Sequence, residues 1–118
     1  MTNADFNVVV KDQLDRIEKV LVKKGDEYSL DTDRLSVFKH AAGFTGETPE
    51  KALYGFMLKH LISVTDMIYS EKAYSKELWE EKMTDIHNYL ILLHGLLQDT
   101  GRMLDKETEK WVKLIPNI

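Results

Sequence analysis

The sequence contains no cysteine. Disulfides, thiolate metal sites and a cysteine nucleophile are therefore excluded, and a reducing compartment, the cytoplasm, is the expected location. The sequence also lacks any apolar run near the roughly 18 residues that a membrane span requires. Its N-terminal residues are polar apart from a short valine run. We therefore expect a protein that is neither secreted nor embedded in a membrane.

The sequence also lacks local clusters of like charge. The formal net charge is -4, and acidic and basic residues are interspersed, so no polybasic patch is present to bind nucleic acid as a polymer. A single nucleotide is still allowed, because a local site can oppose the overall charge. The sequence has no P-loop, GxGxxG or HExxH motif and no readable serine–histidine–acid set, so nucleophilic catalysis has no support.

The composition is that of an ordinary globular protein. Of 118 residues, 43% are hydrophobic and 31% are charged, so the chain can bury a core without a metal or disulfide staple. This length fits one domain. We predict a single all-α domain, a bundle of four to five helices, over residues 1–118.

Two amphipathic segments begin the predicted bundle. The first spans about residues 6–24, and its apolar residues recur at helical spacing: Val10, Leu14, Ile17 and Leu21. A short helix over residues 34–42 follows, with Gly43 just past its end. Its inward residues should be Leu35, Phe38 and Ala42. Its candidate N-caps are Asp31, Thr32 and Asp33.

The next two helices have clearer starts. Thr48 caps a helix that has Pro49 in its first turn and ends near Ser70, and Ser75 caps a central helix that reaches about Leu97. The apolar face of the former comprises Leu53, Met57, Leu61, Val64 and Ile68. That of the latter comprises Met83, Ile86, Leu90, Leu93 and Leu97. Both helices have more apolar surface than a single small bundle would cover, so we expect a homo-oligomer. A short C-terminal helix is predicted at about 103–115.

Acidic side chains occupy one face of the central helix. Glu81, Asp85 and Asn88 are spaced by four and three positions and so share that face, beside the apolar stripe. Two carboxylates there should repel each other unless a cation compensates them, and Mg²⁺ is the oxygen-seeking ion that suits such a pair. Alternatively, both acids lie at a solvated edge and pair with Lys82 or with a lysine of another helix.

The preceding helix carries a second polar stripe. Lys59, Ser63 and Asp66 have the same spacing, and if the two helices pack side by side the stripes can meet around a metal-bound phosphate. The alternative is an ion pair of Lys59 with Asp85 or Glu81.

Further acids lie at the end of the first helix. Asp26 and Glu27 lie at the pole of its dipole that is unfavourable for acidic groups. They are either additional ligands of the same ion or plain loop residues. Among the histidines, His60 is expected at the edge of the core and His40 at the surface.

The order of these segments resembles the MazG-like all-α nucleoside triphosphate pyrophosphohydrolases, especially small phage and prophage proteins. EEKMTDIHNYLILLHGLL resembles the acidic helix of that superfamily, with Asp85 as its aspartate and Glu81 one turn earlier. KKGDEYS, DRLSVFKHAA and MLKHLISVTDM resemble other segments of the phage proteins. The resemblance thus covers roughly residues 14–97.

The resemblance implies an enzyme of nucleotide metabolism that uses Mg²⁺, or Mn²⁺, to release pyrophosphate from a nucleoside triphosphate. The implied metal ligands are Glu81, Asp85, Asp66, Asp26 and Glu27. The implied substrate-binding residues are Lys59, Ser63, Asn88, Lys24 and Tyr28.

One departure from the family pattern is important. MazG-type enzymes carry an EExxE motif on the helix before the acidic one, and this sequence has no such motif. Either Asp26, Glu27 and Asp66 complete the ligand set, or the fold is retained without hydrolysis. Three hypotheses follow: a metal-dependent pyrophosphohydrolase, a non-catalytic nucleotide-binding domain, and a helical protein that acts by contacting another protein.

Overall fold

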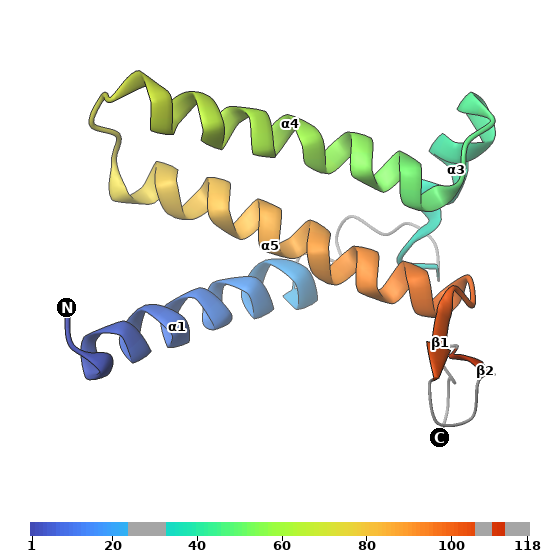
Figure 1. Cartoon of the computed structure of the whole chain (residues 1–118), viewed down its shortest axis with the longest axis horizontal. Helices are drawn as coiled ribbons and strands as arrows, with labels where there is room; N and C mark the ends of the chain where they lie inside the picture. Colours follow the sequence, from blue (N-terminus) through green and yellow to red (C-terminus); the bar gives the residue numbers. More distant parts are fainter. Residues whose placement is uncertain (24–32, 106–109, 113–118) are drawn as a thin grey trace.

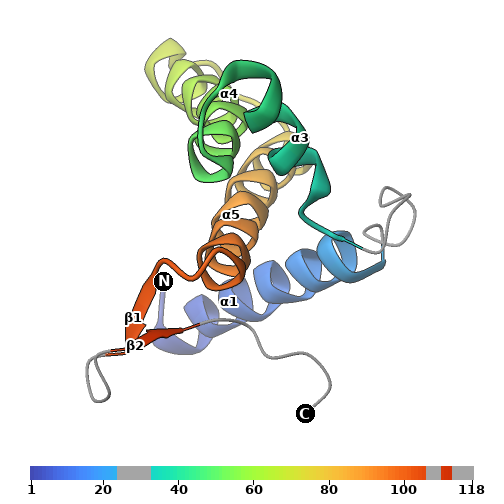
Figure 2. The same ribbon diagram turned by 90° about the vertical axis from the view of Figure 1, so that its right-hand side faces the viewer.

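The computed structural model describes residues 1–23, 33–105 and 110–112, in which the regular secondary structure is helical apart from one short β-ribbon. Helices α4 (Pro49–Ser70) and α5 (Lys76–Asp99) lie side by side and antiparallel (Figure 1). Helix α3 (Ser36–Thr45) packs against α4, and α1 (Asn3–Glu18) packs on the other side of α5 (Figure 2). Helix α5 is therefore central, as predicted. Within the described part of the chain, no helix combines the length and apolar character needed to cross a bilayer.

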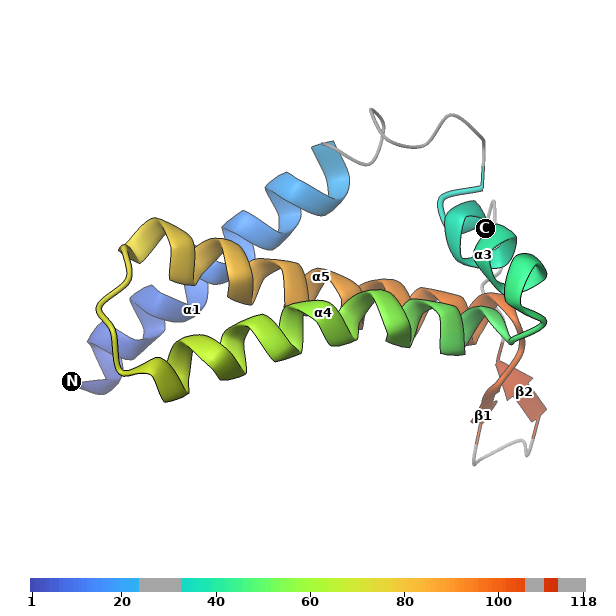
Figure 3. The same ribbon diagram turned by 90° about the horizontal axis from the view of Figure 1, so that it is seen from above.

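The three long helices begin at side-chain caps. The hydroxyls of Thr48 and Ser75 accept hydrogen bonds from backbone N–H groups three residues later, at 3.3 and 3.1 Å, which confirms both predicted starts. Helix α1 starts earlier than predicted because Thr2 and Asp5 form a reciprocal capping box. Helix α1 continues into a π-helical turn, η1 (Lys19–Lys23), and diverges from the α4–α5 pair (Figure 3).

Helix α3 ends later than the sequence pattern indicated. Gly46, not Gly43, adopts the left-handed conformation, with φ of 70°, and ends the helix. At the start, the Asp33 carboxylate accepts a hydrogen bond from the backbone N–H of Leu35 at 2.9 Å. The other two candidate caps, at positions 31 and 32, lie outside the described residues.

The core lies where α3, α4 and α5 meet. Phe38, Leu53 and Leu96 form its buried centre, with Leu35 packed at its edge. The predicted inward face of α3 is thus confirmed. Other members of the predicted apolar faces remain exposed, and their exposed fractions are 36% or more: Val10, Leu14, Leu61, Ile68, Met83 and Leu90. A single chain therefore buries only part of its apolar surface.

The predicted C-terminal helix at 103–115 is wrong where the structure describes that segment. Strands β1 (Met103–Asp105) and β2 (Lys110–Val112) form an antiparallel ribbon, with Leu104 opposite Trp111. Gly101, with φ of 74°, turns the chain away from the axis of α5. A helix of about ten residues is marginal in water, whereas aromatic and β-branched residues such as Trp111 and Val112 favour strands.

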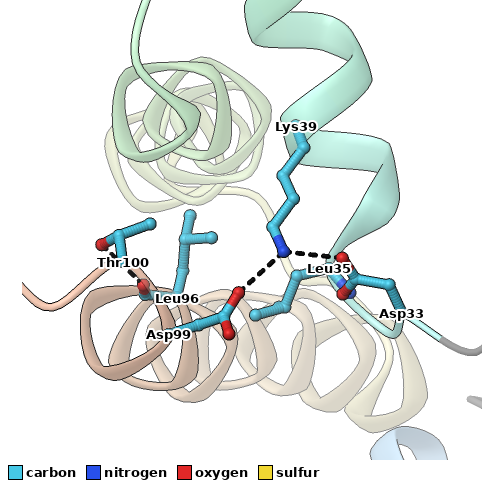
Figure 4. A network of polar contacts seen from close by, with 6 residues as sticks. All are labelled: Asp33, Leu35, Lys39, Leu96, Asp99 and Thr100. Carbon is cyan, nitrogen blue, oxygen red and sulfur yellow. Dashed lines mark hydrogen bonds and ion pairs between the residues drawn. The ribbon is translucent and has the colours of Figure 1, made fainter. Parts of the chain in front are cut away.

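A charged contact joins the start of α3 to the end of α5. The ammonium of Lys39 donates to the carboxylates of Asp33 at 2.6 Å and Asp99 at 2.7 Å (Figure 4). The bond from Lys39, and after it the backbone bond from Leu35, lowers the pKa of Asp33 from its ordinary value of 3.8. The hydrogen bonds that Lys39 donates to Asp33 and then to Asp99 raise the pKa of Lys39. The contact therefore stabilises the fold over the pH range in which Asp33 is ionised and Lys39 is protonated.

Replacing Lys39 with methionine should lower the free energy of unfolding at pH 7 by up to about 1 kcal/mol, because the contact is partly exposed. The lowered pKa of Asp33 means that its stabilisation is present above about pH 3.8 and is lost as the pH falls through the folded-state pKa. Urea unfolding of Lys39→Met and wild type at pH 7 and pH 3 checks this. The difference should shrink at pH 3, and an unchanged difference would exclude the ionic contribution.

Candidate functional site

A cleft of about 430 Å³ lies between α1 with η1 on one side and the first half of α5 on the other. Helix α5 contributes acidic side chains to it, and α1 and η1 contribute basic ones. The lining residues are Arg16, Lys19, Val20, Glu77, Glu80, Glu81, Thr84 and Asp85. A site with both charges on its walls can bind an anion together with a cation.

Two polar contacts fix α1 against α5 at this cleft. The Arg16 guanidinium lies 2.6 Å from the Glu80 carboxylate, whose side chain is only 19% exposed. The Gln13 amide donates to the hydroxyl of the buried Thr84 at 3.0 Å. Helix α1 has no buried residue of its own, so these contacts are important in holding the cleft wall in place.

A second cavity, of about 270 Å³, adjoins the cleft, because Val20 and Asp85 line both. Its wall is largely apolar and aromatic. The lining residues are Val20, Leu21, Arg34, Val37, Phe38, Phe56, Asp85, Asn88, Tyr89 and Leu92. The rings of Phe38 and Phe56 meet edge to face with centroids 5.8 Å apart. Such a cavity suits a flat ring system.

Asn88 lines this cavity, and its side chain carries a buried polar atom that is unsatisfied. Its side chain is 6% exposed, and the amide Oδ1 has no hydrogen-bond partner among the residues that the structure describes. A buried acceptor without a donor costs free energy, and most such groups in proteins are paired. A bound molecule with an N–H or O–H group would satisfy it.

Asp85 contacts a residue that the sequence placed only at the edge of the core. The His60 Nδ1 atom lies 3.5 Å from the Asp85 carboxylate, and the His60 ring packs on Tyr89 with centroids 5.1 Å apart. His60 is partly buried and His40 is exposed, so both histidine predictions are confirmed. Burial, and after it the negative charge of Asp85, raises the pKa of Tyr89.

The polar stripe of α4 does not join this site as a unit. Lys59 lines a separate cavity between α3 and α4, together with Lys51 and Phe56. The contact that Asp85 makes with α4 is with His60, and within the described residues Glu81 forms no ion pair with Lys59 or Lys82. Spacing on α4 correctly grouped its polar residues but could not reveal which neighbour they face.

The predicted metal ligands are divided in space. Glu81 and Asp85 line the cleft one turn apart, whereas Asp66 is exposed on α4 and is not among the lining residues. Ser63, a predicted substrate contact, is half-buried and likewise absent from the lining of the cleft and the adjoining cavity. Lys24, Asp26, Glu27 and Tyr28 lie outside the described residues. Across residues 1–23, 33–105 and 110–112, no three acidic or histidine side chains are grouped to hold a metal ion.

Several cleft residues were missed by the sequence interpretation. Glu77 lies one turn before Glu81, so the acidic row could have been extended to it by spacing alone. Lys19 belongs to the π-helical turn η1, and such turns are frequent at functional sites. The helical periodicity gave no signal for that turn, nor for the approach of Arg16 to Glu80.

No protein-family model matches the chain, and no curated protein or solved structure shows significant similarity to it. The chemistry of the cleft and its adjoining cavity is therefore the basis for assigning a function.

Proposed function

We propose that the cleft and the adjoining cavity bind a nucleoside triphosphate with Mg²⁺ and hydrolyse it to a monophosphate and pyrophosphate. The protein would then be a cytoplasmic enzyme of nucleotide metabolism, of the MazG-like kind that the sequence resembles. One observation carries the proposal: a charged cleft and an aromatic cavity share a wall at Asp85.

A nucleotide has the same two-part chemistry. Its phosphates suit the charged cleft, where Arg16 and Lys19 supply positive charge. Its base suits the cavity between Phe56 and Tyr89, where a base N–H, or a sugar hydroxyl, can donate to the unpaired Oδ1 of Asn88. The unpaired acceptor favours a ligand with a hydrogen-bond donor over a purely apolar one.

The carboxylates of the cleft suit a magnesium ion that is also bound by the phosphates of the substrate. Mg²⁺ is commonly held by one or two carboxylates together with substrate phosphates, and does not need a complete protein cage. Glu81 and Asp85, one helical turn apart on the same wall, provide two such carboxylates. When bound there, Mg²⁺ would neutralise the charge of the phosphates and favour attack at phosphorus.

The reaction needs one further carboxylate. Glu77 lies one turn before Glu81 in the same cleft, and among the described residues it makes no ion pair. In the proposed reaction, Glu77 accepts a proton from the attacking water, the water oxygen bonds to the α-phosphorus, and the bond to the bridging oxygen breaks to release pyrophosphate. Arg16 and Lys19 stabilise the charge on the phosphate oxygens.

Pyrophosphate release from a panel of ribo- and deoxynucleoside triphosphates, with and without Mg²⁺, tests this function. Turnover should require Mg²⁺ and should fall by about 100-fold or more in Glu77→Gln, in line with the usual contribution of a general base. Asp12→Asn, an exposed carboxylate of α1 that does not line the cleft, is the matched control. Equal turnover in both variants would exclude Glu77 as the base.

A second candidate function has its own supporting observation. Large apolar side chains are exposed along α1 and α4, including Phe6 at 55% and Ile62 at 52%. Such surfaces usually mark contacts with other protein chains. In a helical interaction protein or in a homo-oligomer, a second chain would cover these side chains. Nucleotide binding without turnover would indicate a non-catalytic binding domain, and absence of both would favour the interaction protein.

A further inference from the structure

His60 contacts two residues of the candidate site although it is not among the residues that line it. Its Nδ1 atom lies 3.5 Å from Oδ2 of Asp85, and its ring packs on the ring of Tyr89 with centroids 5.1 Å apart and planes inclined by 39°. Asp85 lines both the cleft and the adjoining cavity, and Tyr89 lines the cavity. Any effect of His60 on a molecule bound there would therefore pass through these two side chains.

The two contacts connect α4 to the acidic face of α5. Asp85 and Tyr89 lie one turn apart on α5, and His60 reaches both from α4, which packs beside α5. Packing on Tyr89 restricts the rotation of the His60 ring and so keeps Nδ1 beside the carboxylate. The side chains of His60 and Asp85 are 27% and 34% exposed, so water has only partial access to their contact.

A carboxylate that binds a metal ion must be held in one orientation. Groups that donate a hydrogen bond to a metal ligand, without binding the metal themselves, usually provide this orientation. Hydrogen bonds in such sites are often long in the free protein and shorten when the substrate binds. The separation of 3.5 Å between His60 and Asp85 is consistent with a contact of this kind.

We infer that His60 is a positioning residue, which donates its Nδ1–H to Asp85 and holds that carboxylate toward a Mg²⁺ ion bound together with the phosphates of a nucleotide. The ring contact with Tyr89 keeps the imidazole in place for this task. The role rests on the proposed function and deepens it, because the cleft itself is lined by residues of α1, η1 and α5 alone. Helix α4 would thus contribute to metal binding through His60.

Calorimetric titration of the full chain with α,β-methylene analogues of the nucleoside triphosphates, in saturating Mg²⁺, tests this role. The proposed reaction cannot cleave these analogues. His60→Phe keeps a ring against Tyr89 but removes the N–H group. It should raise the dissociation constant of the analogue by about tenfold or more, the usual effect of losing a partner of a metal ligand. His60→Asn keeps an N–H donor, so its dissociation constant should lie closer to that of the wild type.

A double-variant cycle separates positioning from a purely structural role. If His60 acts through Asp85, adding His60→Phe to Asp85→Asn should change the dissociation constant by less than about twofold, because the effects of coupled residues are not additive. A purely structural role would weaken binding equally in both backgrounds. His94→Phe is the matched control, since His94 is an exposed histidine of α5 that is not among the lining residues. It should bind as the wild type does.

Failure of this role differs from failure of the proposed function. A wild type that binds no analogue in Mg²⁺ would refute both. If the wild type binds, the role of His60 alone is overturned by any of three results: no effect of His60→Phe, an equal loss in His60→Asn, or an undiminished loss in the Asp85→Asn background. Circular dichroism should show the same helicity in every variant.

Discussion

Asp85→Asn should weaken Mg²⁺-dependent binding of a nucleoside triphosphate by more than about 100-fold, since even partners of metal ligands contribute 10- to 100-fold. Asp85 lines both the charged cleft and the aromatic cavity, so the substitution removes the charge shared by the two parts of the site. Calorimetric titration measures the effect. Circular dichroism should show unchanged helicity, because the amide is nearly isosteric with the carboxylate.

Asp66→Asn is the informative control for this prediction. The resemblance implied Asp66 as a ligand of the same ion, but it is exposed on α4 and is not among the residues that line the cleft. Its replacement should leave nucleotide affinity within about twofold of the wild type, as for surface substitutions in general. Equal losses from Asp66→Asn and Asp85→Asn would place the metal elsewhere and refute the assignment of this cleft.

Leu53→Ala should lower the free energy of unfolding by about 2–5 kcal/mol. Leu53 is fully buried, with 0% exposure, in the cluster that it forms with Phe38 and Leu96. Removing the Cγ methine and the two methyl groups there loses apolar burial and leaves a cavity. Chemical denaturation monitored by circular dichroism gives the value directly.

The same substitution at Leu14 provides the control. Leu14 belongs to the predicted apolar stripe of the first helix, yet it is 59% exposed in the structure. Leu14→Ala should therefore cost well under about 1 kcal/mol. If it cost as much as Leu53→Ala, the packing of α1 would differ from that described.

Local signals predicted the helices well and their ends less well. Thr48 and Ser75 act as caps because their hydroxyls meet N–H groups within the same turn, which depends only on neighbouring residues. The end of α3 was misplaced because Gly43 and Gly46 both suit a helix end, and only the backbone conformation distinguishes them. The C-terminal ribbon depends on pairing between two short strands, which no helical period could reveal.

The candidate site was predicted in part. Helical spacing placed Glu81, Asp85 and Asn88 on one face of α5, and the structure brings all three to the cleft and its adjoining cavity. Spacing describes one helix at a time, so it could not show that α1 approaches this face, nor that His60 contacts Asp85 from α4. Both depend on how the helices rotate as they pack.

Isothermal titration of the wild-type protein with nucleoside triphosphates, in Mg²⁺ and in EDTA, tests the central claim most directly. The cleft and its adjoining cavity predict saturable binding in Mg²⁺ that is lost in EDTA, because two carboxylates hold the ion only together with the phosphates. No binding in either condition would contradict the assignment of a nucleotide site.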